Sequence, residues 1–274
     1  MQFGNHFIGL SHPHVMGILN VTPDSFSDGG QHANVPQAVE HALRMIEEGA
    51  TFIDVGGEST RPGAPDVSLQ EELDRTIPVI EAIAKNTECV ISIDTSKADV
   101  MREAARAGAG LINDVRALQE QGALQAAADA KVPVCLMHMQ GQPRTMQQNP
   151  QYSDVVKEVG HFLLDRANAC EEAGIPKEMI LFDPGYGFGK SLEHNYALVK
   201  HLPSLMALGY PVLVGMSRKS MIGNLLNRNV DERLAGSISL ATIVAQMGAQ
   251  IIRVHDVKET ADAVNIVKML NTIK

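Results

Sequence analysis

The chain has no tryptophan and only three cysteines among its 274 residues. Cys89, Cys135 and Cys170 lie far apart and form no C-x-x-C pair, so the sequence indicates neither a disulfide framework nor a zinc ribbon. Cys89 and Cys135 fall in apolar runs, where small buried side chains are expected. The fold must therefore be held by its hydrophobic core, and a chain of this length can bury a large one.

The chain also lacks any apolar run approaching the ~20 residues that cross a bilayer. Residues 1–10 show no basic segment followed by a long apolar one, so no secretory signal is expected. We therefore expect a soluble, cytoplasmic protein with no membrane partner. Cations are scarce as well, since 23 lysines and arginines stand against 32 aspartates and glutamates, a net charge of −9. This balance argues against a nucleic-acid partner, and an anion would bind only where cations gather locally.

Short apolar runs alternate along the chain with longer amphipathic segments. Pro36–Glu48 is a clear helical segment, because Val39, Leu43 and Ile46 recur at helical spacing and Gly49 suits the helix end. The Gly-Ala pair found there returns before apolar runs at positions 108 and 248. This recurrence predicts a repeated short connection from a helix to the next strand.

Eight apolar runs are predicted to be strands, and they are apolar throughout, as strands buried on both faces are. The runs are Val15–Val21, Phe52–Gly56, Cys89–Thr95, Gly110–Val115, Val132–Met139, Ile180–Asp183, Pro211–Met216 and Gln250–His255. Strands alternating with helices predict an α/β fold with a parallel sheet. Eight repeats predict a (β/α)8 TIM barrel with residues 1–274 as a single domain. An open doubly wound sheet is the alternative.

Polar residues stand at the ends of these runs, where the active site of such a barrel lies. They are Asn20, Asp54, Asp94, Asn113, Asp114, His138, Asp183, Ser217, Arg253 and His255. Helix capping is the alternative explanation for Asp94 and Ser217, since Asp and Ser are preferred N-caps. Capping does not suit Arg253 or His255, and the ring of polar residues as a whole predicts a ligand site.

The polar ring sorts by charge into two kinds of group. Arg61, Lys219, Arg253 and His255 are cationic or can become so, which makes them candidates for a phosphate or pyrophosphate clamp. Asp94, Asn113 and Asp183 suit a planar heterocycle that carries several N–H groups. The sequence therefore predicts a site that holds a flat, donor-rich ring at one end and an anion at the other.

Two loops after the first two strands are rich in turn-forming residues and longer than most strand–helix connections. They span residues 22–30 and 58–63, and they carry Phe26 and Arg61. A solvated surface loop is the plain interpretation. The large side chains within them favour a mobile lid over the mouth of the barrel.

The run Asp183–Ser191 resembles a phosphate-binding Walker A loop but does not match it. Pro184 stands where the first glycine of that motif should be, and Lys190 breaks the G-x-G-x-x-G pattern of dinucleotide folds. We therefore predict neither an NTPase nor a dinucleotide fold. The glycines are expected to let the backbone pass close to a flat ligand, with Phe188 as one wall.

Seven segments together resemble the dihydropteroate synthase family, and they extend over almost the whole chain. They are Met16–Phe26, Asp54–Pro62, Asp94–Ser96, Asn113-Asp114, Asp183–Gly185, Ser217–Ser220 and Arg253–Val257. The first two, MGILNVTPDSF and DVGGESTRP, are long and specific. The resemblance implies a bacterial, single-function enzyme that joins 6-hydroxymethyl-7,8-dihydropterin pyrophosphate to p-aminobenzoate. The products are 7,8-dihydropteroate, which serves folate biosynthesis, and pyrophosphate.

The resemblance also assigns roles to individual residues. Catalytic roles fall on Arg61, Asp94, Lys219, Arg253 and His255. The pterin is expected to contact Asp94, Asn113, Val115, Met137, Asp183, Phe188, Gly215 and Lys219. Pyrophosphate is expected to contact Asn20, Thr60, Arg61, Arg253 and His255, with Asn20 also binding a Mg²⁺ cofactor. p-Aminobenzoate, and the sulfonamides that imitate it, are expected to contact Phe26, Thr60, Pro62, Phe188, Ser217 and Lys219. The family further implies a homodimer.

Three other functions fit parts of the pattern. A pterin-binding barrel that passes methyl groups from a folate to a corrinoid protein would share the Asp and Asn residues, but has no need of the Thr-Arg-Pro-Gly loop or of Arg253 and His255. A Schiff-base aldolase would use Lys219, and borohydride would trap it. A catalytically inactive pterin-binding module would release no pyrophosphate when both substrates are present.

Overall fold

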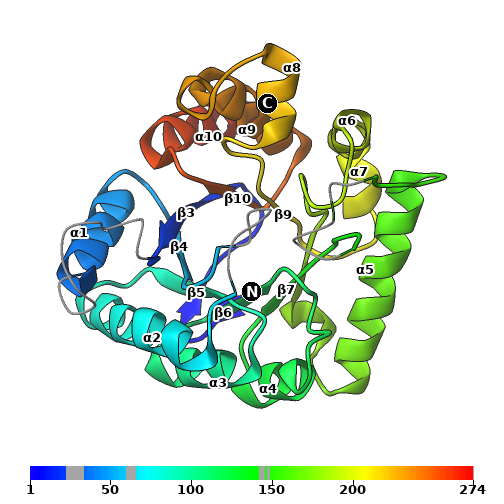
Figure 1. Cartoon of the computed structure of the whole chain (residues 1–274). Helices are drawn as coiled ribbons and strands as arrows, with labels where there is room; N and C mark the ends of the chain where they lie inside the picture. The colour runs from blue at the N-terminus through cyan, green and yellow to red at the C-terminus, as the bar shows by residue number, and fades with distance from the viewer. Residues whose placement is uncertain (23–33, 60–65, 142–145, 147–148, 274) are drawn as a thin grey trace.

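The strands of the chain form a ring of parallel strands surrounded by helices (Figure 1). The computed structural model describes residues 1–22, 34–59, 66–141, 146 and 149–273. The strand order is β8-β7-β6-β5-β4-β3-β10-β9, and a parallel bridge between Phe182 and Val212 joins the two ends of that order. The predicted (β/α)8 barrel is therefore confirmed, and the open doubly wound sheet was the wrong alternative, because an open sheet would leave two unpaired edges.

The barrel strands are β3 His14–Asn20, β4 Phe52–Gly56, β5 Val90–Asp94, β6 Leu111–Asp114, β7 Val134–Met137, β8 Ile180–Asp183, β9 Leu213–Val214 and β10 Ile251–Val254. All eight lie within the predicted runs or within one residue of them. The runs predicted at Val132–Met139 and Pro211–Met216 were too long. Each has a proline near its start, and a proline cannot donate a hydrogen bond to the neighbouring strand.

Helices cover the outside of the ring (Figure 1). They are α1 Asn34–Glu47, α2 Leu69–Asn86, α3 Ala98–Ala107, α4 Ala123–Ala130, α5 Val155–Glu172, α6 Leu192–Lys200, α7 Leu202–Met206, α8 Ser220–Leu226, α9 Leu234–Met247 and α10 Val257–Thr272. Gly49, Gly108 and Gly248 have φ values of 109°, 120° and 99°, the left-handed conformation that ends a helix. The Gly-Ala connection is thus confirmed. Within the described residues, each helix is too short or too polar to cross a lipid bilayer.

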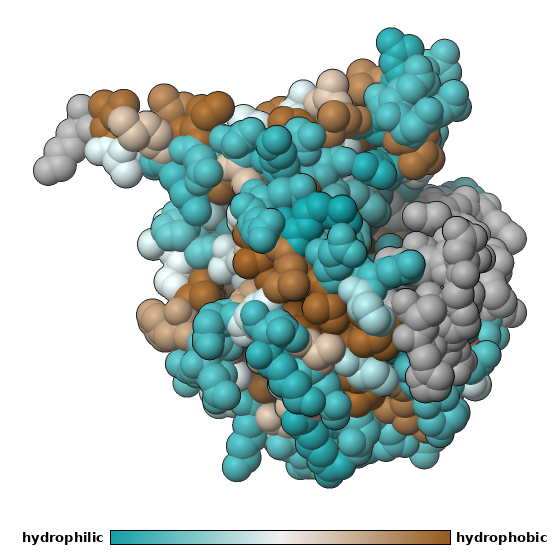
Figure 2. All heavy atoms as spheres, turned by 90° about the vertical axis from the view of Figure 1, so that its left-hand side faces the viewer, coloured by the Kyte–Doolittle hydropathy of each residue, from teal (hydrophilic) through white to brown (hydrophobic). Residues whose placement is uncertain are grey.

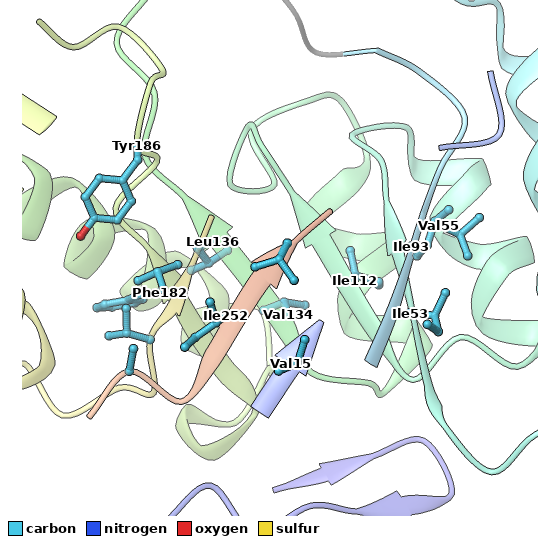
Figure 3. Packing of buried hydrophobic residues seen from close by; sticks show 14 of the residues in the cluster. Val15, Ile53, Val55, Ile93, Ile112, Val134, Leu136, Phe182, Tyr186 and Ile252 are labelled. Atoms are coloured by element: carbon cyan, nitrogen blue, oxygen red, sulfur yellow. The ribbon is translucent and has the colours of Figure 1, made fainter. Parts of the chain in front are cut away.

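Two layers of buried side chains follow from the alternation of residues along each strand. Of every two successive residues in a strand, one packs outward against the helices, as Val15, Ile53, Ile93 and Ile112 do in Figure 3. The other points into the barrel and helps to fill the half that lies toward the N-terminal ends of the strands. These inward residues are Met16, Phe52, Val90, Leu111, Cys135, Leu181, Leu213 and Ile251. A short hairpin of β1 Gln2–Phe3 and β2 His6–Phe7 places Phe3 in this inner layer. Both faces of the strands are therefore buried, as their continuous apolar sequence predicted.

Candidate active site

The alternation of side chains along the strands fills the N-terminal half of the barrel with apolar residues, and it also places the site residues at the C-terminal ends of the strands. Residues two or four positions after an inner apolar residue point into the same interior, nearer the C-terminal ends of the strands. This rule places there Asn20, Asp54, Asp94, Asn113, Val115, Met137, Asp183, Gly215, Arg253 and His255, counted from the inner residues of their own strands. These ten residues therefore converge on one mouth of the barrel because the strand pleat dictates it.

Arg253 occupies the centre of this mouth. Its Nε donates to Asp54 Oδ2 at 2.6 Å, and its Nη2 donates to Asp94 Oδ2 at 2.8 Å. Asn113 Nδ2 donates to the same Asp54 oxygen at 3.2 Å. The Asp54 side chain is fully buried, and its other oxygen has no hydrogen-bond partner among the described residues. One guanidinium thus ties together strands β4, β5 and β10.

The electrostatics of the centre follow from burial and from these pairings. Burial raises the pKa of the Asp94 carboxyl to about 7; Arg253 opposes this rise and Asp54 adds to it. Burial also raises the pKa of Asp183, against the charge of Lys219. For Lys219, burial lowers the pKa to about 8, against the charge of Asp183. Burial would lower the pKa of Arg253 too, but the two carboxylates outweigh it and raise that pKa above its ordinary value. The arginine therefore stays charged, while Asp94 titrates near neutrality.

A second cluster of site residues lies where the glycine-rich run after β8 meets the start of α8. Lys219 Nζ donates to the Tyr186 carbonyl at 2.6 Å and lies 4.7 Å from the centre of the Phe188 ring. Asp183 Oδ1 accepts the backbone N–H of Gly185 at 2.7 Å. A Cβ at Gly215 would lie 3.9 Å from Lys219 Nζ and 3.8 Å from the Arg253 Cβ, so this glycine keeps space open between the two cations. These contacts place Lys219 beside Phe188, which the sequence predicted to contact both the pterin and p-aminobenzoate.

Helix capping does not account for Asp94 or Ser217. Lys97 is the N-cap of α3, and Thr95 Oγ1, not Asp94, accepts its backbone N–H at 3.2 Å. The Ser217 hydroxyl lies 3.1 Å from His255 Nδ1 and accepts the His255 backbone N–H at 3.2 Å. Asp94 therefore faces Arg253, and Ser217 links the ends of β9 and β10.

Two strand-end residues do not belong to the polar ring that the sequence suggested. Asp114 turns away from the mouth, and its carboxylate accepts the backbone N–H groups of Arg116 and Leu118. His138 follows Met137 by one position, so it points to the opposite face. There it packs against Phe162, and burial lowers its pKa to about 3. Including both was wrong, because the pleat gives adjacent residues opposite directions.

The structure also assigns functional places to residues that the sequence analysis left without a role. Asp54 was only one of several strand-end acids, yet it binds both Arg253 and Asn113. Its position two residues after Phe52, an inner residue, was the available signal. At the base of the second loop, Lys97 forms ion pairs with Glu58 and with the buried Glu72, and Arg75 Nη1 donates to the Gly57 carbonyl at 3.1 Å. These residues anchor the start of that loop.

Four predicted site residues, Phe26, Thr60, Arg61 and Pro62, lie outside the described residues, as does most of both predicted lid loops. The other predicted residues are all described. Asn20 is half-buried at the end of β3, and its Oδ1 lies 3.7 Å from the position that a Cβ at Gly56 would take. Val115 and Met137 are buried at the ends of β6 and β7.

Comparison with known proteins agrees with this arrangement. The family model described as "Pterin binding enzyme" matches residues 16–255. The chain is 60% identical over 261 residues to the dihydropteroate synthase of Escherichia coli K12, covering 95% of this chain and 93% of that one. The crystal structure of Yersinia pestis dihydropteroate synthase with a sulfonamide drug superimposes with a TM-score of 0.95, at 56% identity and full coverage of both chains.

A third relative is the dihydropteroate synthase of Xanthomonas albilineans in complex with 7,8-dihydropteroate. It gives a TM-score of 0.91 at 49% identity and covers 99% of this chain and 98% of its own. Sequence, fold and site geometry lead to one conclusion. The chain belongs to the dihydropteroate synthase family of pterin-binding enzymes.

Proposed function

We propose that the protein joins the pterin methylene carbon of 6-hydroxymethyl-7,8-dihydropterin pyrophosphate to the amine of p-aminobenzoate. The carbon–oxygen bond to pyrophosphate breaks, and pyrophosphate leaves with the electron pair. A carbon–nitrogen bond forms, and the amine loses a proton, which gives 7,8-dihydropteroate. The observation that carries this proposal is one barrel mouth in which Asp94, Asn113 and Asp183 share a buried interior with Arg253 and Lys219.

The acidic and amide groups suit the pterin. A carboxylate accepts two hydrogen bonds from a guanidine-like edge, and buried acceptors discriminate strongly because an unmatched one is costly. Asp183 on β8 and Asn113 on β6 are both buried. Asp94 pairs in register with Asn113 across the β5–β6 ladder, so their side chains are neighbours. A flat ring bearing several N–H groups therefore has its acceptors in one place.

The cationic groups suit the leaving group. Charge develops on pyrophosphate as its bond breaks, and preorganised donors aimed at that charge lower the barrier. Arg253 is held at two of its nitrogens by carboxylates, and His255 is oriented by Ser217. Both stand on or just after β10, so a pyrophosphate beside this strand meets them together. The predicted clamp residue Arg61 would complete the set from the second loop.

Mg²⁺ is the cofactor that we include in this proposal, with Asn20 as its protein ligand. Asn20 offers a hard amide oxygen beside Gly56, and the Asp94 side chain lies against the same glycine. The described residues contain no group of three or more His, Cys, Asp or Glu side chains able to hold a metal. A single amide ligand still suits Mg²⁺, which keeps several of its waters and takes its remaining ligands from substrate phosphates. When bound, the ion would neutralise pyrophosphate charge.

A homodimer is a further part of the proposal. Large apolar side chains are exposed over α8, α9 and α10, in the upper part of Figure 2. They are Leu225, Leu226, Val230, Leu234, Ile243, Ile266, Met269, Leu270 and Ile273. Exposed apolar surface of this extent on neighbouring helices is typical of an interface. Sedimentation velocity of the wild type and of Leu270→Glu tests it, and a wild-type monomer at micromolar concentration would contradict it.

The cytoplasm is the location that we propose, because a pyrophosphorylated pterin does not cross membranes and must be made and used in one compartment.

Incubation with both substrates and Mg²⁺ tests the reaction itself. The expected result is dihydropteroate, identified by mass, together with one pyrophosphate for each product molecule. Release of pyrophosphate without dihydropteroate would refute the transfer. Borohydride inactivation that depends on a carbonyl substrate would instead identify Lys219 as a Schiff-base lysine. A sulfonamide should compete with p-aminobenzoate and leave pterin binding intact.

A further inference from the structure

Lys190 is the chemically capable residue of the glycine-rich run that the proposed reaction leaves unused. Only 3% of its surface is exposed. Burial lowers its pKa well below the ordinary value, against the charge of Asp183. A buried amine is costly unless its hydrogen bonds are satisfied. The partners of this amine therefore indicate why it is there.

Among the residues that the structure describes, the hydrogen-bond partners of Lys190 Nζ are all uncharged. It donates to the carbonyl oxygens of Gly185 at 2.8 Å and Phe188 at 2.9 Å. It also lies 3.0 Å from His138 Nδ1 and 3.3 Å from the His138 carbonyl oxygen. The ring of His138 is neutral at physiological pH, because burial and then the neighbouring lysine lower its pKa to about 3. The amine thus fastens both ends of the segment 185–188 to the end of β7.

The same segment presents groups to the active site on its other side. The Tyr186 carbonyl accepts a hydrogen bond from Lys219, and the Phe188 ring lies beneath the Lys219 ammonium. The Tyr186 side chain is fully buried with Phe182 in the outer core, as Figure 3 shows. Its carbonyl and its ring are therefore held by different parts of the protein. The backbone between these anchors is built on glycines, which do not hold a conformation unaided.

We propose that Lys190 is a positioning residue of the active site. By binding the carbonyl groups of Gly185 and Phe188, it fixes the segment that sets the Phe188 ring and the Tyr186 carbonyl against Lys219. This inference rests on the proposed function, with Phe188 and Lys219 expected to contact both p-aminobenzoate and the pterin. Lys190 touches no substrate in this arrangement. Its removal should therefore alter p-aminobenzoate recognition and leave the pyrophosphate groups around Arg253 in place.

Lys190→Met tests the inference, because methionine has a similar length and no donor. The control is Lys200→Met, an exposed lysine at the end of α6. We expect the KM values for p-aminobenzoate and for the pterin substrate both to rise in Lys190→Met, that for p-aminobenzoate about tenfold, the scale of one or two lost hydrogen bonds, with kcat changed less than about threefold. The control should behave as wild type. Unchanged KM values for both substrates, or a fall in kcat alone, would overturn the proposal. If Met at position 190 prevents folding, Lys190→Gln, which keeps two donors, takes its place.

A double-mutant cycle separates positioning from general destabilisation. Once Phe188→Ala has removed the ring, Lys190→Met should add little to the p-aminobenzoate KM. Full additivity of the two substitutions would contradict the inference. Product formation by the wild type under the same conditions tests the proposed function separately, so the two failures are distinguishable.

A spectroscopic readout needs no substrate. The chain has no tryptophan, so Phe188→Trp introduces a single tryptophan at the segment, which can be excited selectively over the four tyrosines. Adding Lys190→Met to it should shift the emission to longer wavelength and lower the anisotropy, because the ring is no longer held against Lys219. Identical emission and anisotropy in the two variants would show that Lys190 does not position the ring, whatever reaction the protein catalyses.

Discussion

Arg253→Ala should lower both turnover and stability, and the structure separates the two effects. The arginine forms ion pairs with the fully buried Asp54 carboxylate and with Asp94. Removing one partner of a buried ion pair costs about 3–5 kcal/mol, because the remaining charge is left uncompensated. Removing a preorganised donor to a leaving group costs about 2–4 kcal/mol in the transition state, roughly 30- to 1,000-fold in rate. The variant should still fold, since the outer and inner cores are untouched.

The stability loss should depend on pH. The Asp94 pKa is raised in the folded protein, so the folded state binds the proton more tightly than the unfolded state does. Stability from this group is present at low pH and is lost as pH rises through the folded pKa, by up to about 1.4 kcal/mol per pH unit. Arg253 holds that pKa down to about 7. Without the arginine the Asp94 pKa lies above 7, and the pH range over which this stability is lost extends above 7 as well. Arg253→Ala should therefore lose more stability than the wild type between pH 6 and pH 8.

Urea denaturation at pH 6 and pH 8 measures this loss, and dihydropteroate formation measures turnover. The double variant Asp54→Asn with Arg253→Ala is the informative companion, because it removes one freed carboxylate as well as the arginine. Its stability should recover in part, while its turnover should stay low. Recovery of turnover in the double variant would show that Arg253 acts only by neutralising Asp54. A single variant with normal turnover would refute the pyrophosphate assignment altogether.

Three further outcomes are expected. At pH values below 7, affinity for the pterin, measured by calorimetry, should decrease by up to about tenfold per pH unit as Asp94 takes up a proton. Asp94→Asn should bind the pterin weakly without this pH dependence, while p-aminobenzoate recognition changes less. Gly185→Ala should destabilise the protein by about 2 kcal/mol or more in thermal denaturation, because the residue has a φ of 68° and its Cβ would lie 1.9 Å from the His138 carbonyl oxygen; an unchanged melting temperature would contradict this. Hydrogen exchange across residues 22–35 and 57–66 should slow when pterin, Mg²⁺ and p-aminobenzoate bind, and equal exchange would rule out the lid expected from their sequence.

The sequence was sufficient for the barrel and for most of the candidate site, and the reason is geometric. A strand of a closed parallel barrel is buried on both faces, so its sequence is apolar until it reaches the mouth, where the inward residues become polar. Asn113 and Asp183 follow this rule two residues after an inner apolar side chain, and Asp94 follows it four residues after Val90. His138 and Asp114 were assigned to the site wrongly because reading the end of a run ignores which face each residue takes.

Partners remote in the sequence could not be predicted. Asp54 and Arg253 are 199 residues apart, and no local pattern relates them. Lys190 drew attention only as the residue that breaks the G-x-G-x-x-G pattern, although its four contacts come from the end of β7 and from the glycine-rich run. The predicted length of one strand was wrong for a different reason. The Pro211–Met216 run is apolar throughout, but β9 pairs with β10 at only Leu213 and Val214.

The arrangement at the mouth explains how a protein with a net charge of −9 can hold a pyrophosphorylated ligand. Asp54 and Asp94 keep Arg253 charged and aligned, and the arginine offsets much of the cost of burying them. Arg253 and one oxygen of each carboxylate are therefore paired before any ligand arrives. A ligand carrying only phosphate would take the arginine from its carboxylates and leave buried negative charge. A ligand carrying N–H donors as well as phosphate oxygens gives Asp94 a new partner while it engages Arg253. Electrostatic balance thus favours a pterin joined to pyrophosphate over either part alone.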